Sequence, residues 1–233
     1  MMQKLAGKLN ARWTISVALL AALTFSLVCS DSIQYGHADA PIAKTAELIE
    51  PLEVGDRAPR FIVETVDHQA FVFDPRTLER PALLVSFRGG WCPHCNMHLS
   101  ELRFVVSEID ALGVDVMFLS GDRPDVLYSS LERETQATVD NLDYRILSDA
   151  DAQAAIGLGI AFRASSQTIE RRRTKGDDIE ASSMEKHGIL PVPAVFAVGT
   201  DGLIAFAYAN PDYKVRLPAD QLLAVAEQLA GAK

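Results

Sequence analysis

Two cysteines three residues apart, Cys92 and Cys95, constrain this chain more than any other feature of its sequence. They follow an apolar run at residues 82–87, which predicts a strand that is buried on both faces, and a Gly-Gly turn at residues 89–90. A long amphipathic segment, typical of a helix, begins at the cysteines themselves. Two cysteines at this spacing can close a small disulfide, and a helix N-terminus favours a thiolate. The pattern therefore predicts redox chemistry.

The first 38 residues have the pattern of a signal peptide or N-terminal anchor. Three basic residues precede an apolar centre at residues 15–28, which is short for a membrane-spanning helix. A cleavage site fits at residues 36–38 or at residues 28–30. We rank a cleaved signal first and an uncleaved anchor second. A lipoprotein modified at Cys29 ranks third, because the preceding valine is bulky for that processing. Each alternative places the domain in the periplasm or outside the cell, where disulfide chemistry is common.

We expect residues 39–51 to form a tether and residues 52–233 to form one domain. The formal net charge of the chain is −9, and cleavage after Ala38 would change it to −11 by removing three basic residues and one acidic residue. An acidic domain is a poor candidate for nucleic acid binding. The one basic run, residues 171–173, precedes acidic residues and indicates a solvated surface.

Apolar periodicity predicts the element order β-β-β-α-β-α-β-α-β-β-α. The predicted strands are residues 61–65, 71–73, 82–87, 114–119, 144–147, 194–198 and 203–208, and the predicted helices are residues 92–112, 124–135, 149–156 and 218–229. A polar stretch at about residues 160–190 has no clear period and predicts a surface insertion. This order predicts an α/β fold, a three-layer α/β/α sandwich with a mixed central sheet.

The segment 83–95 resembles the active-site strand and turn of thioredoxin-fold proteins. Over about residues 51–231, the chain resembles the peroxiredoxin-like branch of the AhpC/TSA family (alkyl hydroperoxide reductase/thiol-specific antioxidant). The segments that carry the resemblance are residues 54–61, 87–93, 147–149 and 192–198. The resemblance implies a thioredoxin-like sandwich with an N-terminal β-hairpin extension, and a thiol-dependent antioxidant activity.

The chain departs from typical peroxiredoxins close to the cysteines. Those proteins carry Thr or Ser three residues before the peroxide-reacting cysteine and Pro seven residues before it. Counted from Cys92, these positions hold Gly89 and Val85; counted from Cys95, they hold Cys92 and Arg88. The hydroxyl group that orients peroxide is therefore missing in either alignment. The Pro-His pair between the cysteines resembles that of strongly oxidising periplasmic disulfide oxidoreductases.

Cys92 is the expected nucleophile, because the helix N-terminus stabilises its thiolate. Cys95, one turn into the helix, is the expected resolving thiol. The alternatives are a structural disulfide and half of a zinc site. Zinc normally requires four ligands, no second C-x-x-C is present, and His68, His94 and His187 show no ligand spacing. We therefore expect no metal and no cofactor.

Five neighbouring residues are expected to support the cysteines. His94 would stabilise the thiolate, and Pro93 fits the first helical turn. Arg88 would lower the pKa of the thiol or hold a peroxide oxygen, and Trp91 would pack beside the disulfide. The resemblance implies that Pro193 follows a cis peptide bond facing the cysteines, whereas local energetics favour trans. For four of these residues there is an alternative without a functional role: an exposed helix start for His94, a solvated side chain for Arg88, core packing for Trp91 and an extended trans segment at Pro193.

Three functions remain open. The first is a periplasmic or secreted thiol–disulfide oxidoreductase that cycles Cys92 and Cys95, with protein thiols or disulfides as substrate and a redox partner protein. The second is a hydroperoxide reductase in which Cys92 is oxidised to a sulfenic acid and Cys95 resolves it. The third is a non-catalytic thioredoxin-like binding module, which the intact C-x-x-C opposes. We expect no nucleic acid partner, and membrane contact only through an N-terminal anchor.

Overall fold

The structure is a computed structural model that describes residues 41–127, 129, 145–176, 179 and 182–231. The predicted signal peptide or anchor, residues 1–38, lies outside the described residues. So does most of the helix predicted at residues 124–135, of which the structure shows one 3-10 turn, η2, at Pro124–Val126. In the part of the chain that is described, no helix is both long and apolar enough to cross a bilayer.

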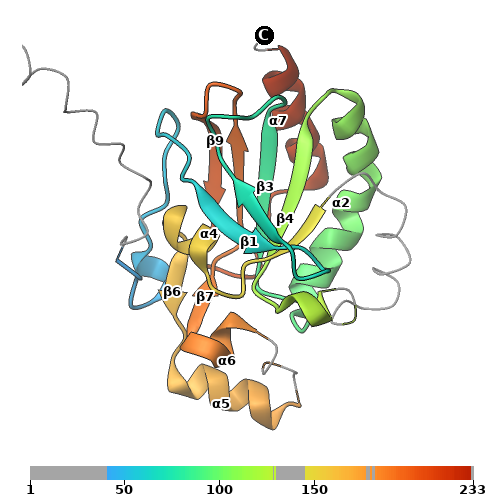
Figure 1. Ribbon diagram of the computed structural model, residues 1–233. Coiled ribbons are helices and arrows are strands. Elements are labelled where there is room, and N and C mark those ends of the chain that lie inside the picture. Colours follow the sequence, from blue (N-terminus) through green and yellow to red (C-terminus); the bar gives the residue numbers. More distant parts are fainter. Residues whose placement is uncertain (1–40, 128, 130–144, 177–178, 180–181, 232–233) are drawn as a thin grey trace, which may run out of the picture. The chain divides into compact units, whose positions relative to one another are not determined.

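A seven-stranded mixed sheet forms the centre of the domain, in the order β2-β1-β5-β4-β3-β8-β9 (Figure 1). Its strands are β1 (Phe61–Glu64), β2 (Ala70–Phe73), β3 (Ala82–Phe87), β4 (Asp115–Ser120), β5 (Arg145–Ser148), β8 (Ala194–Val198) and β9 (Ile204–Ala209). Strands β3, β4 and β5 are parallel, and β8 and β9 continue the sheet antiparallel to β3. The β1–β2 hairpin pairs antiparallel with β5, which confirms the predicted N-terminal hairpin.

Helices cover both faces of the sheet. They are α2 (Pro93–Ala111), α4 (Gln153–Gly157), α5 (Ser166–Thr174), α6 (Ser183–His187) and α7 (Ala219–Gly231). Helices α2 and α7 pack together, and their apolar side chains form one core with Leu83, Val85 and Phe87 of β3. The alternate side chains of β3, such as Leu84, join a second core with α4 on the opposite face. Every residue of β3 is buried for this reason, and the predicted three-layer sandwich is confirmed.

The polar insertion at about residues 160–190 is more regular than its sequence predicted. Strands β6 (Ala161–Arg163) and β7 (Ile189–Pro191) form a small antiparallel sheet, with α5 and α6 between them in the chain. All nine residues of α5 are described and none of them is buried, so this helix has no apolar stripe for periodicity to detect. The hydroxyl of Ser165 caps α5 by accepting a hydrogen bond from the Thr168 N–H at 3.1 Å.

The described part of the segment before residue 52 is hydrogen-bonded to the domain. The N–H of Ala43 donates to the Ala161 carbonyl at 3.1 Å, and the N–H of Arg163 donates to the Ala43 carbonyl at 2.9 Å. The N–H of Leu52 donates to the Leu158 carbonyl at 3.1 Å. These contacts lie within the residues for which the sequence predicted a tether and a domain boundary.

Candidate active site

The two cysteines lie where β3 passes into α2, at one end of the central sheet. Cys92 is the N-cap residue of α2, and Cys95 lies in its first turn. The N–H groups of Cys95 and Asn96 both donate to the Cys92 carbonyl, at 2.9 and 3.2 Å, and so begin the helix. Both thiols are free, and each cysteine is only 1% exposed. The fold thus places both sulfur atoms in a nearly dry environment.

The turn that presents the cysteines is fixed by a carboxylate and an amide. Gly89 has a φ of +139°, and a Cβ at this position would lie 2.3 Å from Oδ1 of Asp122. The other carboxylate oxygen, Oδ2, accepts a hydrogen bond from the Gly90 N–H at 2.7 Å, and Nδ2 of Asn96 donates to the Gly90 carbonyl at 2.6 Å. Neither side chain was predicted from the sequence to belong to the site. Asp122 had a detectable signal, since it follows β4, whose carboxyl end meets that of β3 at the same sheet edge.

A guanidinium group reaches the second cysteine from a distant part of the chain. Residues 210–218, which we call the strap, connect β9 with α7. From the strap, Nη2 of Arg216 donates to Sγ of Cys95 at 3.3 Å, and Nε donates to the Tyr213 carbonyl at 3.1 Å. Arg216 and Cys95 are separated by 121 residues, and the strap has no periodic pattern. No local sequence signal therefore pointed to this contact.

The pKa values of the two cysteines are shifted in opposite directions. Burial acts to raise the pKa of Cys95, but the hydrogen bond from the Cys92 thiol and the charge of Arg216 together outweigh it and lower the pKa to about 6. The pKa of Cys92 is raised, because its thiol donates to Cys95 and because it is buried. In the described part of the chain, the Cys92 side chain makes no capping hydrogen bond to α2. Cys95, which the sequence predicted as the resolving thiol, is therefore the more acidic thiol of the pair.

Arg88 contributes a second positive charge to the site. It is 6% exposed, so the alternative of a solvated side chain is wrong. Burial lowers the pKa of its guanidinium, and the two nearby cysteines oppose this effect. Its Nε donates to the Pro191 carbonyl at 3.4 Å, and its Cζ lies 4.6 Å from the ring centroid of Tyr213. The structure therefore brings Arg88 to the dithiol, as the sequence predicted.

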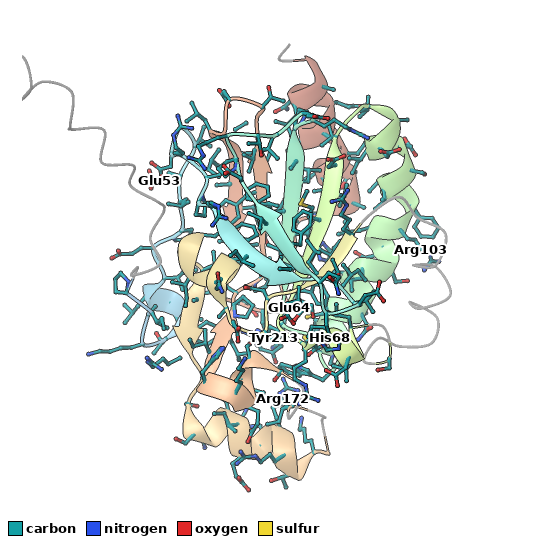
Figure 2. All side chains as sticks on the ribbon, viewed as in Figure 1. Glu53, Glu64, His68, Arg103, Arg172 and Tyr213 are labelled. Atoms are coloured by element: carbon teal, nitrogen blue, oxygen red, sulfur yellow. The ribbon has the colours of Figure 1, made fainter. Side chains whose placement is uncertain are left out.

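The other predicted supporting residues have aromatic or helical contacts. His94 makes an edge contact with Tyr213, with ring centroids 5.5 Å apart, and Pro93 occupies the first turn of α2 as predicted. Trp91 is partly buried, and Arg172 of α5 lies over its ring at 5.1 Å. Figure 2 shows Arg172 and Tyr213 at the same end of the central sheet. The insertion and the strap thus both reach the residues around the dithiol.

The prediction of a cis peptide bond before Pro193 is wrong. All peptide bonds among the described residues are trans, including the one that joins Val192 to Pro193. A trans X–Pro bond is favoured by about 0.5–1 kcal/mol, which is the preference that local energetics indicated for this bond. The Pro193 carbonyl accepts a hydrogen bond from the Asn210 N–H at 3.1 Å, so this residue anchors the start of the strap.

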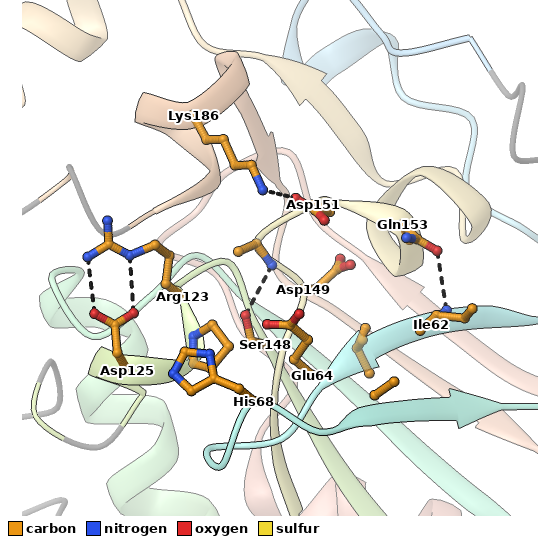
Figure 3. A pocket seen from close by; sticks show the side chains of 14 residues that line it. Ile62, Glu64, His68, Arg123, Asp125, Ser148, Asp149, Asp151, Gln153 and Lys186 are labelled. Atoms are coloured by element: carbon orange, nitrogen blue, oxygen red, sulfur yellow. Dashed lines mark hydrogen bonds and ion pairs between the residues drawn. The ribbon is translucent and has the colours of Figure 1, made fainter.

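A separate cavity of about 260 Å³ lies beside the β1–β2 hairpin (Figure 3). Four of its charged side chains form two ion pairs: Arg123 pairs with Asp125, and Lys186 pairs with Asp151. Asp149 accepts hydrogen bonds from two N–H groups at the start of α4, both at 2.9 Å, and burial raises its pKa to about 7. Neither cysteine is among the described residues that line this cavity, and no cluster suited to a metal ion occurs among the residues the structure describes. The dithiol is therefore the candidate active site.

Comparisons with known proteins agree with this assignment. A model of the AhpC/TSA family matches residues 54–207. Peroxiredoxin Bcp of Escherichia coli K12 is 29% identical over 112 residues, which are 48% of this chain and 67% of the relative. A peroxiredoxin-like protein from Aquifex aeolicus has a similar structure, with a TM-score of 0.57, 20% identity, and coverage of 77% of this chain and 89% of that chain. The peroxidoxin BcpB from Mycobacterium tuberculosis has a TM-score of 0.52 at 16% identity, covering 78% and 97% of the two chains. The predicted thioredoxin-like fold is thereby confirmed.

Proposed function

The chain belongs to the AhpC/TSA family, and from this premise we propose that it reduces hydroperoxides with the dithiol of Cys92 and Cys95. Membership makes it a peroxiredoxin-like, thiol-dependent oxidoreductase. The observation that carries the proposal is the 3.3 Å hydrogen bond from Arg216 to the buried sulfur of Cys95. Because the thiolate is the nucleophilic form of cysteine, a cation at one sulfur prepares that sulfur for attack.

In the proposed reaction, Sγ of Cys95 attacks the terminal oxygen of a hydroperoxide. A sulfur–oxygen bond forms, the oxygen–oxygen bond breaks, and the leaving alkoxide takes up a proton to become an alcohol or water. The sulfur loses two electrons and becomes a sulfenic acid. Arg88 and Arg216 would stabilise the negative charge as it moves from sulfur to the leaving oxygen.

Cys92 would complete the oxidation. Its thiol attacks the sulfenic sulfur of Cys95, a disulfide forms, and water leaves. An external dithiol then supplies two electrons and two protons and restores both thiols. These roles reverse those predicted from the sequence, and they place Cys92 at the position where typical peroxiredoxins carry Thr or Ser. The hydrogen bond that the Cys92 thiol gives to Cys95 would take over part of the role of that hydroxyl.

The test is the rate at which the reduced chain reacts with hydrogen peroxide. Trp91 fluorescence would report oxidation in a stopped-flow instrument, with Trp13→Phe and Cys29→Ser removing the other indole and the other thiol. We expect a rate constant at least about 100-fold above that of a free cysteine thiolate, the size of one well-placed electrostatic contact. A rate no better than that of free cysteine would contradict the proposed function.

Two further variants assign the roles of the cysteines. Cys95→Ser is expected to abolish the fast reaction. Cys92→Ser is expected to keep it but to accumulate a sulfenic acid, which dimedone would label at Cys95 for mass spectrometry. If the fast reaction instead survives in Cys95→Ser and is lost in Cys92→Ser, then Cys92 is the peroxide-reacting cysteine, as the sequence predicted.

Thiol–disulfide exchange with a protein substrate is the second candidate function. The C-x-x-C spacing favours it, because the first turn of α2 already holds the two thiols within hydrogen-bonding range. The burial of both sulfurs opposes it, because a protein disulfide must reach the sulfur that attacks it. Mixed disulfides trapped by a single-cysteine variant, together with slow oxidation by peroxide, would support this second function.

The proposal extends to the electron donor of the reaction and to the location of the protein. We propose a thiol–disulfide redox protein as donor, because the oxidised product of the reaction is an intramolecular disulfide. A periplasmic or secreted location is supported by the signal-like pattern of residues 1–38. Fractionation of cells that express the full chain would test the location, and recovery in the cytosolic fraction would contradict it.

A further inference from the structure

The strap is bonded to α2 at two adjacent positions. Cys95 and His98 lie three residues apart, so they share one face of the helix. Arg216 and Leu217 follow one another in the strap. Nη2 of Arg216 donates to Sγ of Cys95 at 3.3 Å, and the carbonyl of Leu217 lies 2.8 Å from Nε2 of His98. The histidine therefore holds the backbone immediately next to the residue whose charge meets the thiolate.

His98 makes this bond as a neutral donor. It is 5% exposed, and burial lowers its pKa to about 4. Because a carbonyl oxygen can only accept, the hydrogen of the neutral ring lies on Nε2 and points at Leu217. A separation of 2.8 Å is that of a well-formed hydrogen bond. The bond is therefore unchanged by pH across the neutral range.

The other polar contacts of the strap hold Arg216 less directly. Nε of Arg216 donates to the carbonyl of Tyr213, and the ring of Tyr213 meets α2 through its edge contact with His94, with ring centroids 5.5 Å apart. The bond from the Asn210 N–H to the Pro193 carbonyl lies at the other end of the strap. Leu217 is buried in the core with α2 and α7, and this apolar packing gives no direction to its carbonyl.

We propose that His98 is a positioning residue, which holds Arg216 against the thiolate of Cys95 through the carbonyl oxygen of Leu217. Loss of this bond would let the guanidinium move away from the sulfur, and the attraction between them weakens with distance. The catalytic meaning of His98 rests on the proposed function. The effect of His98 on the acidity of the resting thiol does not depend on the proposed function.

The test is the ionisation of the dithiol, followed by thiolate absorbance at 240 nm in the full chain with Cys29→Ser. His98→Leu removes the donor and keeps an apolar side chain, whereas His98→Gln keeps an N–H near the position of Nε2. We expect His98→Leu to raise the lower thiol pKa by about one unit or more, and His98→Gln to leave it close to that of the unmodified chain. Combined with Arg216→Met, His98→Leu should add no further shift, because both changes remove the same interaction.

A purely structural role gives a different result. In that case His98→Leu would lower the midpoint of urea unfolding but leave the thiol pKa of the folded protein unchanged, and the proposal would be overturned. Additive shifts of His98→Leu and Arg216→Met would overturn it as well.

A second measurement needs no substitution of His98, in case that variant fails to fold. The ¹⁵N shifts of the His98 ring, followed by NMR in the Cys29→Ser chain, should change at the pH where Cys95 ionises, because both side chains are bonded to the strap. If the ¹⁵N shifts of the His98 ring do not change at the pH where Cys95 ionises, the proposal is contradicted. Neither experiment contains a peroxide, so failure of the hydroperoxide function would leave these results intact, and the reverse also holds.

Discussion

Replacing Arg216 with methionine should make Cys95 a much weaker acid. The guanidinium is 3.3 Å from Sγ, and burial leaves little water to screen the two charges. An opposite charge at such a distance lowers a pKa by about 1–3 units. If the pKa of Cys95 rises from about 6 by about 2 units, the ionised fraction at pH 7 falls about tenfold.

The pH dependence of oxidation by hydrogen peroxide measures this change. We expect Arg216→Met to react about tenfold more slowly at pH 7 and to recover as the pH is raised above 8, where its thiolate forms. The matched control is Arg76→Met, because Arg76 is an exposed arginine that pairs with Asp74. A rate that falls equally at every pH, with an unchanged midpoint, would show that Arg216 binds the substrate and does not set the acidity of Cys95.

Three further predictions concern stability, and urea unfolding tests each of them. Gly89→Ala should destabilise the fold by about 2–4 kcal/mol, because its positive φ is strained for alanine and its Cβ would clash with Asp122; an unchanged midpoint would contradict the role given to this turn. Between pH about 4 and about 7, Asp149 is ionised in the unfolded chain but protonated in the folded chain. The free energy of unfolding of the unsubstituted chain should therefore fall as the pH rises through this range, relative to that of Asp149→Asn; a constant difference between pH 5 and pH 8 would refute this. As the pH falls from 6.5 to about 4, the unfolded chain protonates His98 and the fold does not, so the parent should lose stability relative to His98→Gln; parallel curves would show that His98 titrates normally.

The elements that carry the dithiol were predictable because their signals are local. Residues 82–87 are continuously apolar, and the structure buries every one of them between two cores. The helix expected at residues 92–112 is observed at Pro93–Ala111, since its apolar positions recur at helical spacing. Helix α5 escaped prediction for the opposite reason, because it buries none of its nine described residues and its sequence carries no period.

The side chains around the dithiol were harder to predict, because they come from separate parts of the chain. Arg88 lies four residues before Cys92, and its place beside the thiols followed from that nearness. Asp122 reaches the site from the end of β4, where its place after a buried strand was the one available signal, and Arg216 reaches it from the strap, where neither periodicity nor a motif marks it. The cis bond expected before Pro193 came from family resemblance alone, and the trans bond that local energetics favour is the one observed.

The opposite pKa shifts of the two cysteines reflect two electrostatic effects that compete at this site. The sequence placed the thiolate on Cys92 because a helix N-terminus carries a partial positive charge, an effect of about 0.3–1 kcal/mol. Arg216 brings a full positive charge to Cys95, and two unit charges about 4 Å apart interact by about 4 kcal/mol at an effective dielectric constant of about 20. The guanidinium is the larger of these two effects, and together with the hydrogen bond from the Cys92 thiol it lowers the pKa of Cys95, while the pKa of Cys92 is raised. A C-x-x-C motif at the start of a helix therefore predicts a reactive pair, and in the proposed function the cation that reaches Cys95 from 121 residues away in the sequence makes that sulfur the nucleophile.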